Sequence, residues 1–482
     1  MPAAILFDNS YARLPPRFHV RLDPTPVGAP RLVRLNTALA EQLGIDPSIL
    51  TADILAGNAV PDGATPLAAA YAGHQFGNFV PQLGDGRAIL LGEVVGRDGV
   101  RRDFQLKGAG PTPFSRGGDG RAALGPVLRE YLVSEAMAAL GVPTTRALAA
   151  VTTGQPVARE SLLPGAVLAR VASSHIRVGT FQYFAARGDT DAVRILADHV
   201  IARHYPDAAK AENPYRALLE AVVSRQAGLI ARWLLIGFIH GVMNTDNCSV
   251  AGETIDYGPC AFMDTYDPTT VFSSIDRHGR YAYGNQPRIG VWNLARLAET
   301  LLPLLHENED SAVEIAKQVL GQFSETFEPA YFGGLGRKIG LASVKDGDTA
   351  LVNDLLKLMA ENNADFTLTF RKLCDGDAAA REEFTDRAAF DAWAVGWRWR
   401  LGDETAEPAA VRDAMRAVNP AFIPRNHLVE EALIAAIEHD DFIPFETLLT
   451  VLSRPFDDQP GFERYARPPM PDQRVVQTFC GT

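Results

Sequence analysis

The pattern of apolar residues changes near residue 180, and this change limits the folds that the chain can adopt. Before that point one helix is predicted, from about Pro126, which suits a first helical turn, to Gly141, which suits the position after the last turn. Around this helix the apolar residues form short runs bounded by Gly, Asp or Pro, which are typical of strands, at 88–95, 103–107 and 166–171. The segment therefore predicts a small unit of strands and one helix.

After residue 180 the apolar residues recur with the period of helices. The predicted helices cover 192–205, 218–241, 311–327, 350–361, 378–399 and 427–439. A hairpin is predicted at 248–258, shortly after the helix that is expected to end at Gly241. The first 60 residues are rich in Pro and loop signals and carry one short helical pattern at 35–43, so we expect them to wrap around the rest. The chain is thus predicted to be α+β, with units at 1–60, 61–180, 181–340 and 341–482.

The composition makes several kinds of function improbable for this chain. The net charge is −12, and no run of like charges occurs, which is a poor basis for neutralising nucleic-acid phosphates. Four cysteines, none in a CxxC pair, are too few for a disulfide framework, so a reducing compartment is expected. The start lacks the features of a signal peptide, and no apolar run reaches the roughly 18 residues that cross a bilayer. We expect a cytoplasmic protein with no membrane or nucleic-acid partner.

The segment HGVMNTDNCSVAGETIDYG, at 240–258, carries the strongest chemical signal. Asn247 follows His240 by seven positions, which is the spacing of His and Asn in the catalytic loop of protein kinases. The triplet that begins at Asp256, Asp-Tyr-Gly, stands where the kinase D-F-G would follow. An Asn amide oxygen and an Asp carboxylate are hard ligands that hold Mg²⁺ or Mn²⁺ against nucleotide phosphates. Asn247 and Asp256 are therefore the predicted metal ligands.

A second signal is a strand lysine followed by a helix glutamate. Lys107 ends the strand DFQLK, and Glu130 lies 23 positions later on the predicted helix. Such a pair aims an ammonium group at phosphate oxygens. Glu135 competes with Glu130 as the partner, and both cannot face the lysine because they lie about 140° apart around the helix axis.

Further cations and a glycine turn accompany this lysine. Gly84-Asp85-Gly86-Arg87 is predicted to form a tight turn between two strands, where a loop that covers phosphates would lie. Four cations in one cleft would suit a triphosphate, and the sequence offers Arg87, Lys107, Arg170 and Arg177.

The position of the kinase catalytic base is filled differently. In register, Val242 stands where the aspartate that accepts the hydroxyl proton would be, and valine accepts no proton. Asp246, beside the predicted metal ligand Asn247, is the remaining carboxylate that could act as a base. A displaced base implies that a different phosphorus atom reacts, or that catalysis has been abandoned.

With these motifs the sequence resembles the selenoprotein O family of protein adenylyltransferases. The resemblance covers nearly the whole chain and includes long specific blocks, namely 71–93, 106–137, 173–185, HGVMNTDN and IDYGPCAFMD. It implies a two-lobed, protein-kinase-like fold that lacks the usual catalytic Asp, that is, a pseudokinase fold. It also implies transfer of AMP from ATP to Ser, Thr or Tyr hydroxyls of proteins, with the nucleotide flipped relative to kinases.

The resemblance assigns roles to individual residues of this chain. The implied base is Asp246, and the implied metal ligands for Mg²⁺ or Mn²⁺ are Asn247 and Asp256. The implied nucleotide contacts are Gly84, Gly86, Arg87, Lys107, Asp119, Gly120, Arg170, Arg177 and Asp256. If Lys107, Arg170 and Arg177 grip the outer phosphates, the α-phosphorus faces the mouth of the cleft and its attack expels pyrophosphate.

The resemblance also draws attention to the C-terminal cysteine. Cys480 stands at the position that carries selenocysteine in some animal members, which suggests a redox role and a reversible disulfide with Cys260 after the Asp-Tyr-Gly motif. Two alternatives to AMP transfer remain open. A phosphotransferase with a displaced base would transfer the γ-phosphate, and a non-catalytic scaffold would bind ATP without turnover.

Overall fold

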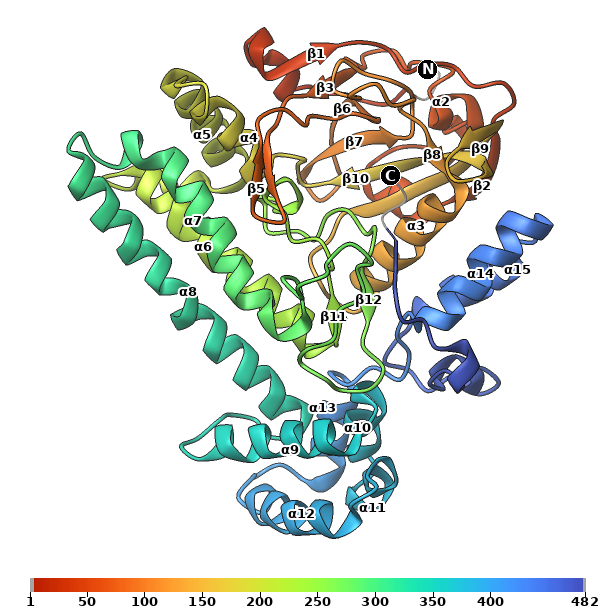
Figure 1. Cartoon of the computed structure of the whole chain (residues 1–482), viewed down its shortest axis with the longest axis vertical. Helices are drawn as coiled ribbons and strands as arrows, with labels where there is room; N and C mark the ends of the chain where they lie inside the picture. The colour runs from red at the N-terminus through yellow and green to blue at the C-terminus, as the bar shows by residue number, and fades with distance from the viewer. Residues whose placement is uncertain (1–3, 480–482) are drawn as a thin grey trace.

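The computed structural model describes residues 4–479 and combines an antiparallel sheet with many helices (Figure 1). The main sheet of this part of the chain has eight strands in the order β1-β3-β6-β7-β10-β9-β2, with β8 paired to β10. All of its pairings are antiparallel. The strands are β1 (His19–Arg21), β2 (Arg31–Leu35), β3 (Leu67–Ala69), β6 (Ala88–Val95), β7 (Arg101–Lys107), β8 (Ala122–Ala123), β9 (Arg146–Ala158) and β10 (Leu162–Ala172). The strands expected at 88–95, 103–107 and 166–171 are thereby confirmed.

Strand β7 shows how the sheet separates its core from its polar face. Successive side chains of a strand point to opposite faces. Phe104 and Leu106 are fully buried in a cluster that also contains Leu39 and Leu55, from the short helices α1 (Thr37–Gln42) and α2 (Ala52–Ala56). The N-terminal residues thus cover one face of the sheet. The alternate residues of β7, which end with Lys107, face the other way, toward the site.

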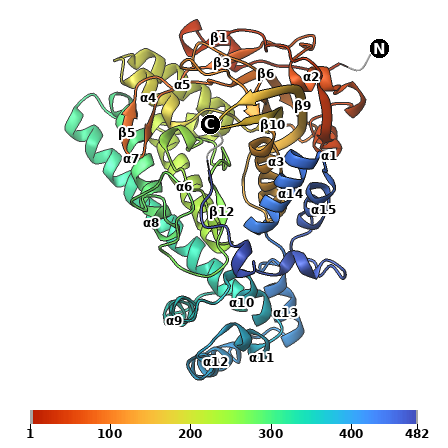
Figure 2. The same ribbon diagram turned by 45° about the vertical axis from the view of Figure 1, so that its right-hand side comes forward.

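Helix α3 (Leu124–Ala139) packs against β9 and β10 on the face that carries Lys107 (Figure 1). Pro126 lies in its first turn, and Gly141 follows its end with a φ of 76°, as predicted. Helices α14 (Asn426–His439) and α15 (Ile443–Leu452) contact α3, and Figure 2 shows them lying beside it. The C-terminal helices α14 and α15 therefore pack against the helix that covers this face of the sheet.

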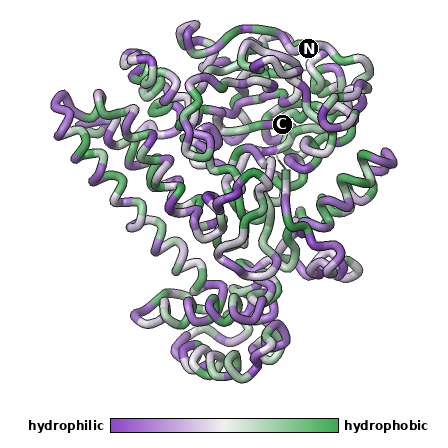
Figure 3. Tube along the Cα trace, viewed as in Figure 1, coloured by the Kyte–Doolittle hydropathy of each residue, from purple (hydrophilic) through white to green (hydrophobic). Residues whose placement is uncertain are grey.

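The rest of the chain is mainly helical. Helices α6, α7 and α8 pack together and form the long group at the left of Figure 1, while the shorter helices α9 to α13 lie at the bottom. The bounds are α4 (Val178–Ala185), α5 (Thr190–His204), α6 (Pro214–Leu235), α7 (Gln286–Leu305), α8 (Glu309–Lys338), α9 (Asp348–Asn362), α10 (Phe366–Leu373), α11 (Asp377–Ala380), α12 (Arg387–Leu401) and α13 (Pro408–Arg416). Among residues 4–479, no helix has both the length and the apolar character that a membrane span requires. In Figure 3, green hydrophobic stretches lie in the middle of the view, and green and purple residues alternate along the long helices at the left.

The helix predicted at 218–241 ends earlier than expected. Helix α6 stops at Leu235, and Gly237 turns the chain with a φ of 72°. The next two residues form β11 (Phe238–Ile239), which pairs with β12 (Ala261–Phe262). The whole run is apolar because helix and strand are both buried, so periodicity alone could not mark the boundary.

Two other predicted elements also differ. The segment 248–258 is no hairpin, because Ser249 bridges to Arg177 and Thr254 bridges to Thr144 instead of pairing with each other. The helix predicted at 378–399 is divided into α11, a turn of 3₁₀ helix and α12. Asp386 causes the second start, since its side chain accepts a hydrogen bond from the Ala389 N–H as an N-cap.

Candidate active site

A cavity of about 940 Å³ lies between the sheet, helix α3 and the segment 242–259. Twelve residues that the sequence singled out line this one cavity. They are Gly84, Gly86, Arg87, Lys107, Asp119, Gly120, Glu130, Arg170, Arg177, Asp246, Asn247 and Asp256. The fold thus brings together residues that lie up to 172 positions apart in the chain, from Gly84 to Asp256.

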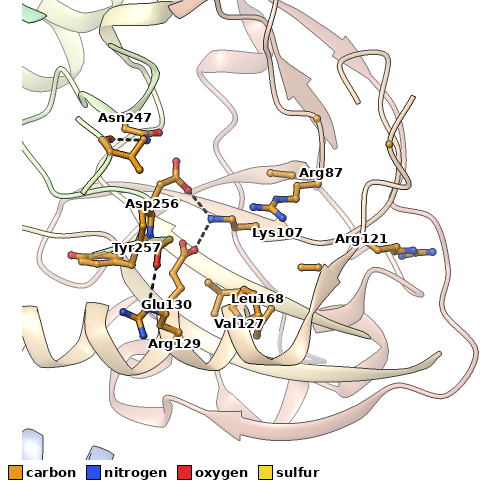
Figure 4. Close-up of a pocket in the computed structure, with 18 of the residues that line it drawn as sticks. Arg87, Lys107, Arg121, Val127, Arg129, Glu130, Leu168, Asn247, Asp256 and Tyr257 are labelled. Carbon is orange, nitrogen blue, oxygen red and sulfur yellow. Dashed lines mark hydrogen bonds and ion pairs between the residues drawn. The ribbon is translucent and has the colours of Figure 1, made fainter. Parts of the chain in front are cut away.

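Lys107 ends β7 and points between two carboxylates (Figure 4). Its Nζ lies 2.5 Å from Glu130 Oε2 and 2.7 Å from Asp256 Oδ1. Glu130 is thus the helix glutamate that contacts Lys107. Glu135, the competing partner, binds Arg146 on β9 at 2.6 Å and so serves the other side of α3. The two glutamates have different partners because they lie about 140° apart around the axis of α3.

Two arginines complete a cationic group around Asp256. Arg170 on β10 stands opposite Gln105 of β7, and its Nη1 lies 2.9 Å from both Glu130 Oε1 and Asp256 Oδ1. Arg177, just before α4, reaches Asp256 Oδ2 with its Nη1 at 2.9 Å. Both arginines are buried. A buried cation is stable only when paired, so these contacts hold the positive charges in place.

The Asp256 carboxylate contacts all three cations of this group. Burial raises the pKa of its carboxyl, but the charges of Lys107, Arg170 and Arg177 outweigh burial and hold the pKa well below its usual range. The carboxylate is therefore ionised at every physiological pH. The backbone of Asp256 has a φ of 64°, a left-handed conformation that non-glycine residues seldom adopt. Such backbone strain is retained at functional sites, where it aims a side chain.

Asp246 lies in the 3₁₀ turn Thr245–Asn247 and lines the same cavity, where the Arg177 Nη1 that pairs with Asp256 also donates to the Asp246 backbone carbonyl at 2.7 Å. Burial raises the pKa of its carboxyl to about 6, although the nearby Arg177 acts to lower it. Gln75 donates a hydrogen bond to Oδ2 at 3.3 Å, while Oδ1 is buried and has no hydrogen-bond donor within residues 4–479. A carboxylate with a spare oxygen and a pKa near neutrality has the properties of a general base.

Asn247 follows directly, and its side-chain amide is oriented. Its Nδ2 donates to the Val242 carbonyl at 3.0 Å, an interaction drawn in Figure 4, which leaves the amide oxygen as the atom available to a ligand. Together with the Asp256 carboxylate this oxygen fits a hard cation such as Mg²⁺ or Mn²⁺. The described residues contain no group of three or more His, Cys, Asp or Glu side chains arranged to hold a metal. Such a cation would therefore also need phosphate oxygens as ligands.

Two residues of the kinase-like register have clear places. Val242 lines the cavity, so an apolar side chain does occupy the surface where the sequence register places the kinase base. His240 is buried, and its Nε2 lies 3.0 Å from the Ile255 carbonyl oxygen. The imidazole thereby positions the residue just before Asp256 and takes a structural role.

The glycine turn has a packing role that the sequence did not reveal. A Cβ at Gly84 would lie 2.3 Å from the ring of Phe114, and one at Gly86 would lie 2.9 Å from the Phe114 carbonyl oxygen. The turn precedes β6 but is not a hairpin between paired strands, because the preceding strand β5 (Asn78–Val80) pairs only with β4 (Gly73–Gln75), among the described residues. Small residues are needed here because a second loop presses against the turn.

That second loop carries the remaining predicted nucleotide contacts. Gly120 has a φ of 65°, and a Cβ there would lie 2.1 Å from the Gly110 backbone. Asp119 accepts a hydrogen bond from Arg159 at 2.9 Å near the rim of the cavity. In Figure 4, Arg87 and Arg121 lie on the side of Lys107 away from Asp256. Cations therefore line the cavity from its deep end to its rim.

The predicted redox pair is only partly covered by the structure. Cys260 is buried, and burial raises the pKa of its thiol to about 11. Cys480 lies outside the described residues, so the disulfide stays a prediction. Thr478 is described, and its Oγ1 donates to the carbonyl of Pro259, the residue before Cys260, at 2.6 Å.

Sequence reasoning missed three residues that shape the site. Gln105 accepts a hydrogen bond from Arg170 Nε at 2.8 Å, Gln75 contacts Asp246, and the ring of Tyr71 lies 4.6 Å from the Arg177 guanidinium carbon. The alternation in DFQLK places Gln105 on the face of Lys107 and could have revealed it. Tyr71 and Gln75 lie in loop-like sequence that carries no such periodic signal.

The fold and site define a class of enzyme. A cavity with buried cations, hard oxygen ligands and a carboxylate poised near neutrality is typical of a transferase that acts on a nucleoside triphosphate. The sequence profile described as protein adenylyltransferase SelO matches residues 3–453. The chain therefore belongs to the SelO family of protein adenylyltransferases.

Curated relatives agree over the full length. A protein nucleotidyltransferase YdiU of Methylorubrum extorquens is 69% identical over 498 residues, covering 100% of both chains. Those of Bradyrhizobium diazoefficiens and Rhizobium rhizogenes are 67% and 64% identical, covering 99% of this chain and 99% and 97% of theirs. The similarity includes every segment that lines the cavity, as far as Phe479.

Proposed function

We propose that this enzyme transfers AMP from ATP to Ser, Thr or Tyr hydroxyls of proteins and releases pyrophosphate. The observation that carries the proposal is the difference between the two carboxylates of the cavity, Asp246 and Asp256. Lys107, Arg170 and Arg177 all pair with the Asp256 carboxylate, whereas the Asp246 carboxylate forms no ion pair within residues 4–479 and has an oxygen that lacks a donor there. Cations of this kind suit the outer phosphates, and the carboxylate suits the incoming hydroxyl.

The chain's own groups account for the proposed reaction. The acceptor oxygen attacks the α-phosphorus as Asp246 removes its proton, a new oxygen–phosphorus bond forms, and the bond between the α-phosphorus and the bridging oxygen to the β-phosphorus breaks. The electron pair leaves with pyrophosphate, and Lys107, Arg170 and Arg177 stabilise that developing negative charge. Val242 at the kinase-base position favours this reaction over γ-phosphate transfer, because no proton acceptor stands there.

The proposal includes a divalent metal, Mg²⁺ or Mn²⁺. Asn247 and Asp256 would hold it, since an oriented amide oxygen and an ionised carboxylate are the ligands such ions prefer. The bound ion would supply positive charge that neutralises phosphate oxygens.

The proposed fold is that of a two-lobed pseudokinase. A strand lysine paired with a helix glutamate, and an Asp-Tyr-Gly aspartate that meets both, support this proposal. The N-lobe would span 61–180 and the C-lobe 181–340, a boundary that falls within α4 (Val178–Ala185), shortly after the last strand of the sheet ends at Ala172. Residues 1–60 would form the wrap and 341–482 the C-terminal extension.

Parallel labelling tests the function. The enzyme is incubated with α-labelled and γ-labelled ATP and a mixture of Ser, Thr and Tyr peptides, with Lys107→Ala as the inactive control. We expect only the α-label to stay on peptide or protein, with a loss of about 10²–10³ in rate for the variant. Retained γ-label would instead identify a phosphotransferase. ATP binding without either label would identify a scaffold.

A further inference from the structure

A second cavity, of about 950 Å³, adjoins the first. The two cavities share Phe76 and Ile275 in their linings, so a chain that leaves one can enter the other. The second cavity is formed by the segment 275–280, the start of α7 and the tip of the β4–β5 hairpin. We call it the basic groove and define it by Phe76, Arg277, His278, Arg280, Arg288 and Trp292.

The basic groove carries positive charge that the protein does not neutralise. Arg277, Arg280 and Arg288 line it, and within residues 4–479 none of them forms an ion pair with a carboxylate. Asp276 is the sole acidic residue of the lining, and it is buried, with its oxygens accepting the backbone N–H groups of Arg280 and Tyr281 at 2.9 and 2.7 Å. A concentration of unpaired cations is unusual on a chain whose net charge is −12.

Aromatic rings hold one of these arginines in place. The guanidinium carbon of Arg280 lies 4.7 Å from the ring centroid of Trp292 and 5.7 Å from that of Tyr281. Its Nε is buried and has no hydrogen-bond acceptor in the described part of the chain. Stacked arginines are pre-ordered for a ligand, because less side-chain freedom is lost on binding. An unsatisfied donor on such a side chain favours an anionic ligand.

The wall between the cavities is tied to the proposed base. Gln75 donates to Asp246, and the N–H of the next residue, Phe76, donates to Asn244 Oδ1 at 3.0 Å. Phe76 and Gly77 have φ values of 50° and 88°, which is typical of the tight turn of a two-residue hairpin. The ring of Phe76 lies 5.1 Å from that of Tyr281, beside the basic groove. If the acceptor hydroxyl of a substrate lies at Asp246, the substrate residues next to it would therefore pass over Phe76 into this groove.

We propose that the basic groove binds an acidic stretch of the protein substrate, next to the hydroxyl that accepts AMP. The proposal rests on the proposed function, because it places the acceptor hydroxyl at Asp246. Unpaired exposed arginines select Asp and Glu side chains by charge, while Trp292 and Phe76 offer apolar surface to the chain between them. The enzyme would thus prefer Ser, Thr or Tyr residues flanked by carboxylates.

Equilibrium binding tests the groove without requiring turnover. Fluorescence anisotropy compares a short labelled peptide, with a central Ser flanked by Asp and Glu, with its isosteric Asn and Gln counterpart. The variant R277Q/R288Q removes two exposed charges of the groove. The matched control R97Q/R387Q removes two exposed arginines that line neither cavity and form no ion pair within residues 4–479.

The wild type and the control should bind the acidic peptide at least about tenfold more tightly than the neutral one, and the groove variant should lose that preference. A charge-reversed variant, R277E/R288E, should prefer a Lys-flanked peptide. Equal binding of both peptides by the wild type, or an unchanged preference in R277Q/R288Q, would overturn the proposal. Displacement of the acidic peptide by an RNA oligonucleotide that binds more tightly would overturn it in favour of a nucleic-acid ligand.

These measurements separate the two proposals. If α-label transfer fails but the charge preference holds, the groove is an acidic-peptide site and the proposed reaction is wrong. If α-label transfer succeeds with neutral and acidic peptides equally and binding shows no preference, the reaction stands and the groove proposal is wrong.

Discussion

Gln75 donates a hydrogen bond to Asp246 Oδ2 at 3.3 Å, and this contact joins the β4–β5 hairpin to the carboxylate proposed as the base. The hairpin also crowds the other oxygen, since a Cβ at Gly73 would lie 2.6 Å from Asp246 Oδ1. Asp246 is therefore buried by the hairpin on one side and open to the cavity on the other. That environment raises its pKa, and three predictions depend on it.

Asp246→Asn should abolish AMP transfer while making the protein more stable. Loss of a general base lowers the rate about 10²–10⁴-fold. The folded-state pKa of about 6 lies above the value of 3.8 for an ordinary Asp, so at neutral pH the buried charge opposes folding. Its removal should raise the free energy of unfolding by about 1–3 kcal/mol at pH 7. Thermal melts and α-label transfer check both effects.

This gain in stability should depend on pH in a defined direction. Because the folded pKa of Asp246 is raised, the wild type is penalised above about pH 6, and the penalty disappears as the pH falls toward 4. Melting temperatures of wild type and variant should therefore converge in acid. If the difference in melting temperature between variant and wild type is constant from pH 4 to pH 8, burial of this charge is not the cause of the difference.

The rate of AMP transfer should fall in acid with a midpoint near pH 6. Only ionised Asp246 accepts a proton, and its pKa is raised to about 6 by burial. The profile of kcat should rise tenfold per pH unit below the midpoint and level off above it. Measurement of ATP affinity over the same range is the control, since Asp256 stays ionised throughout. A flat profile between pH 5 and pH 7 would remove Asp246 from the role of base.

Glu130 and Glu135 form a matched pair of variants on one helix. Glu130→Gln should reduce AMP transfer at least about tenfold, because Lys107 and Arg170 both depend on this carboxylate for their placement. Glu135→Gln breaks the 2.6 Å pair with Arg146, away from the cavity, and should lower stability without changing kcat. Equal loss of activity in both variants would mean that damage to α3, and not the lysine pair, causes the effect.

Asp256→Asn should separate ATP binding from catalysis. The Asp256 carboxylate forms ion pairs with Lys107, Arg170 and Arg177, the cations that we propose bind phosphates. Its replacement by a neutral amide therefore leaves more positive charge available to ATP. We expect ATP to bind more tightly in the presence of EDTA, while AMP transfer with Mg²⁺ or Mn²⁺ is lost. Calorimetry with and without metal measures the first effect. Weaker metal-free binding would show that Asp256 does not compete with phosphate.

Local patterns predicted much of the cavity. The run DFQLK was predicted as a strand that ends at Lys107, as β7 does, and the helix period predicted that Glu130 and Glu135 face different sides of α3. Both results follow from fixed geometry within one element. In contrast, the end of α6 at Leu235 was missed because the strand that follows is as apolar as the helix.

Contacts between distant segments could not be predicted in this way. The three cations were expected to face phosphates, yet they also hold Asp256, and this pairing depends on how β10 and the segment before α4 meet the Asp-Tyr-Gly loop. The basic groove was missed as well. Arg277 and Arg280 lie in irregular chain, and Arg288 begins a helix, so only the tertiary structure places them together.

The predicted disulfide between Cys260 and Cys480 should form at a rate that depends on pH. Thr478 Oγ1 donates to the Pro259 carbonyl at 2.6 Å, so the described part of the chain passes beside the residue that precedes Cys260. Burial raises the pKa of the Cys260 thiol to about 11, so Cys260 is a poor nucleophile at neutral pH. Oxidised glutathione should therefore first react with Cys480 and release one reduced glutathione. The Cys260 thiolate then displaces the second glutathione from Cys480, and this step should accelerate with rising pH.

Mass spectrometry of the non-reduced protein should find the linked peptides, increasing from pH 7 to pH 9, and Cys374→Ser should leave the yield unchanged. Absence of a 260–480 linkage at pH 9, with glutathione still attached to Cys480, would rule out the pair.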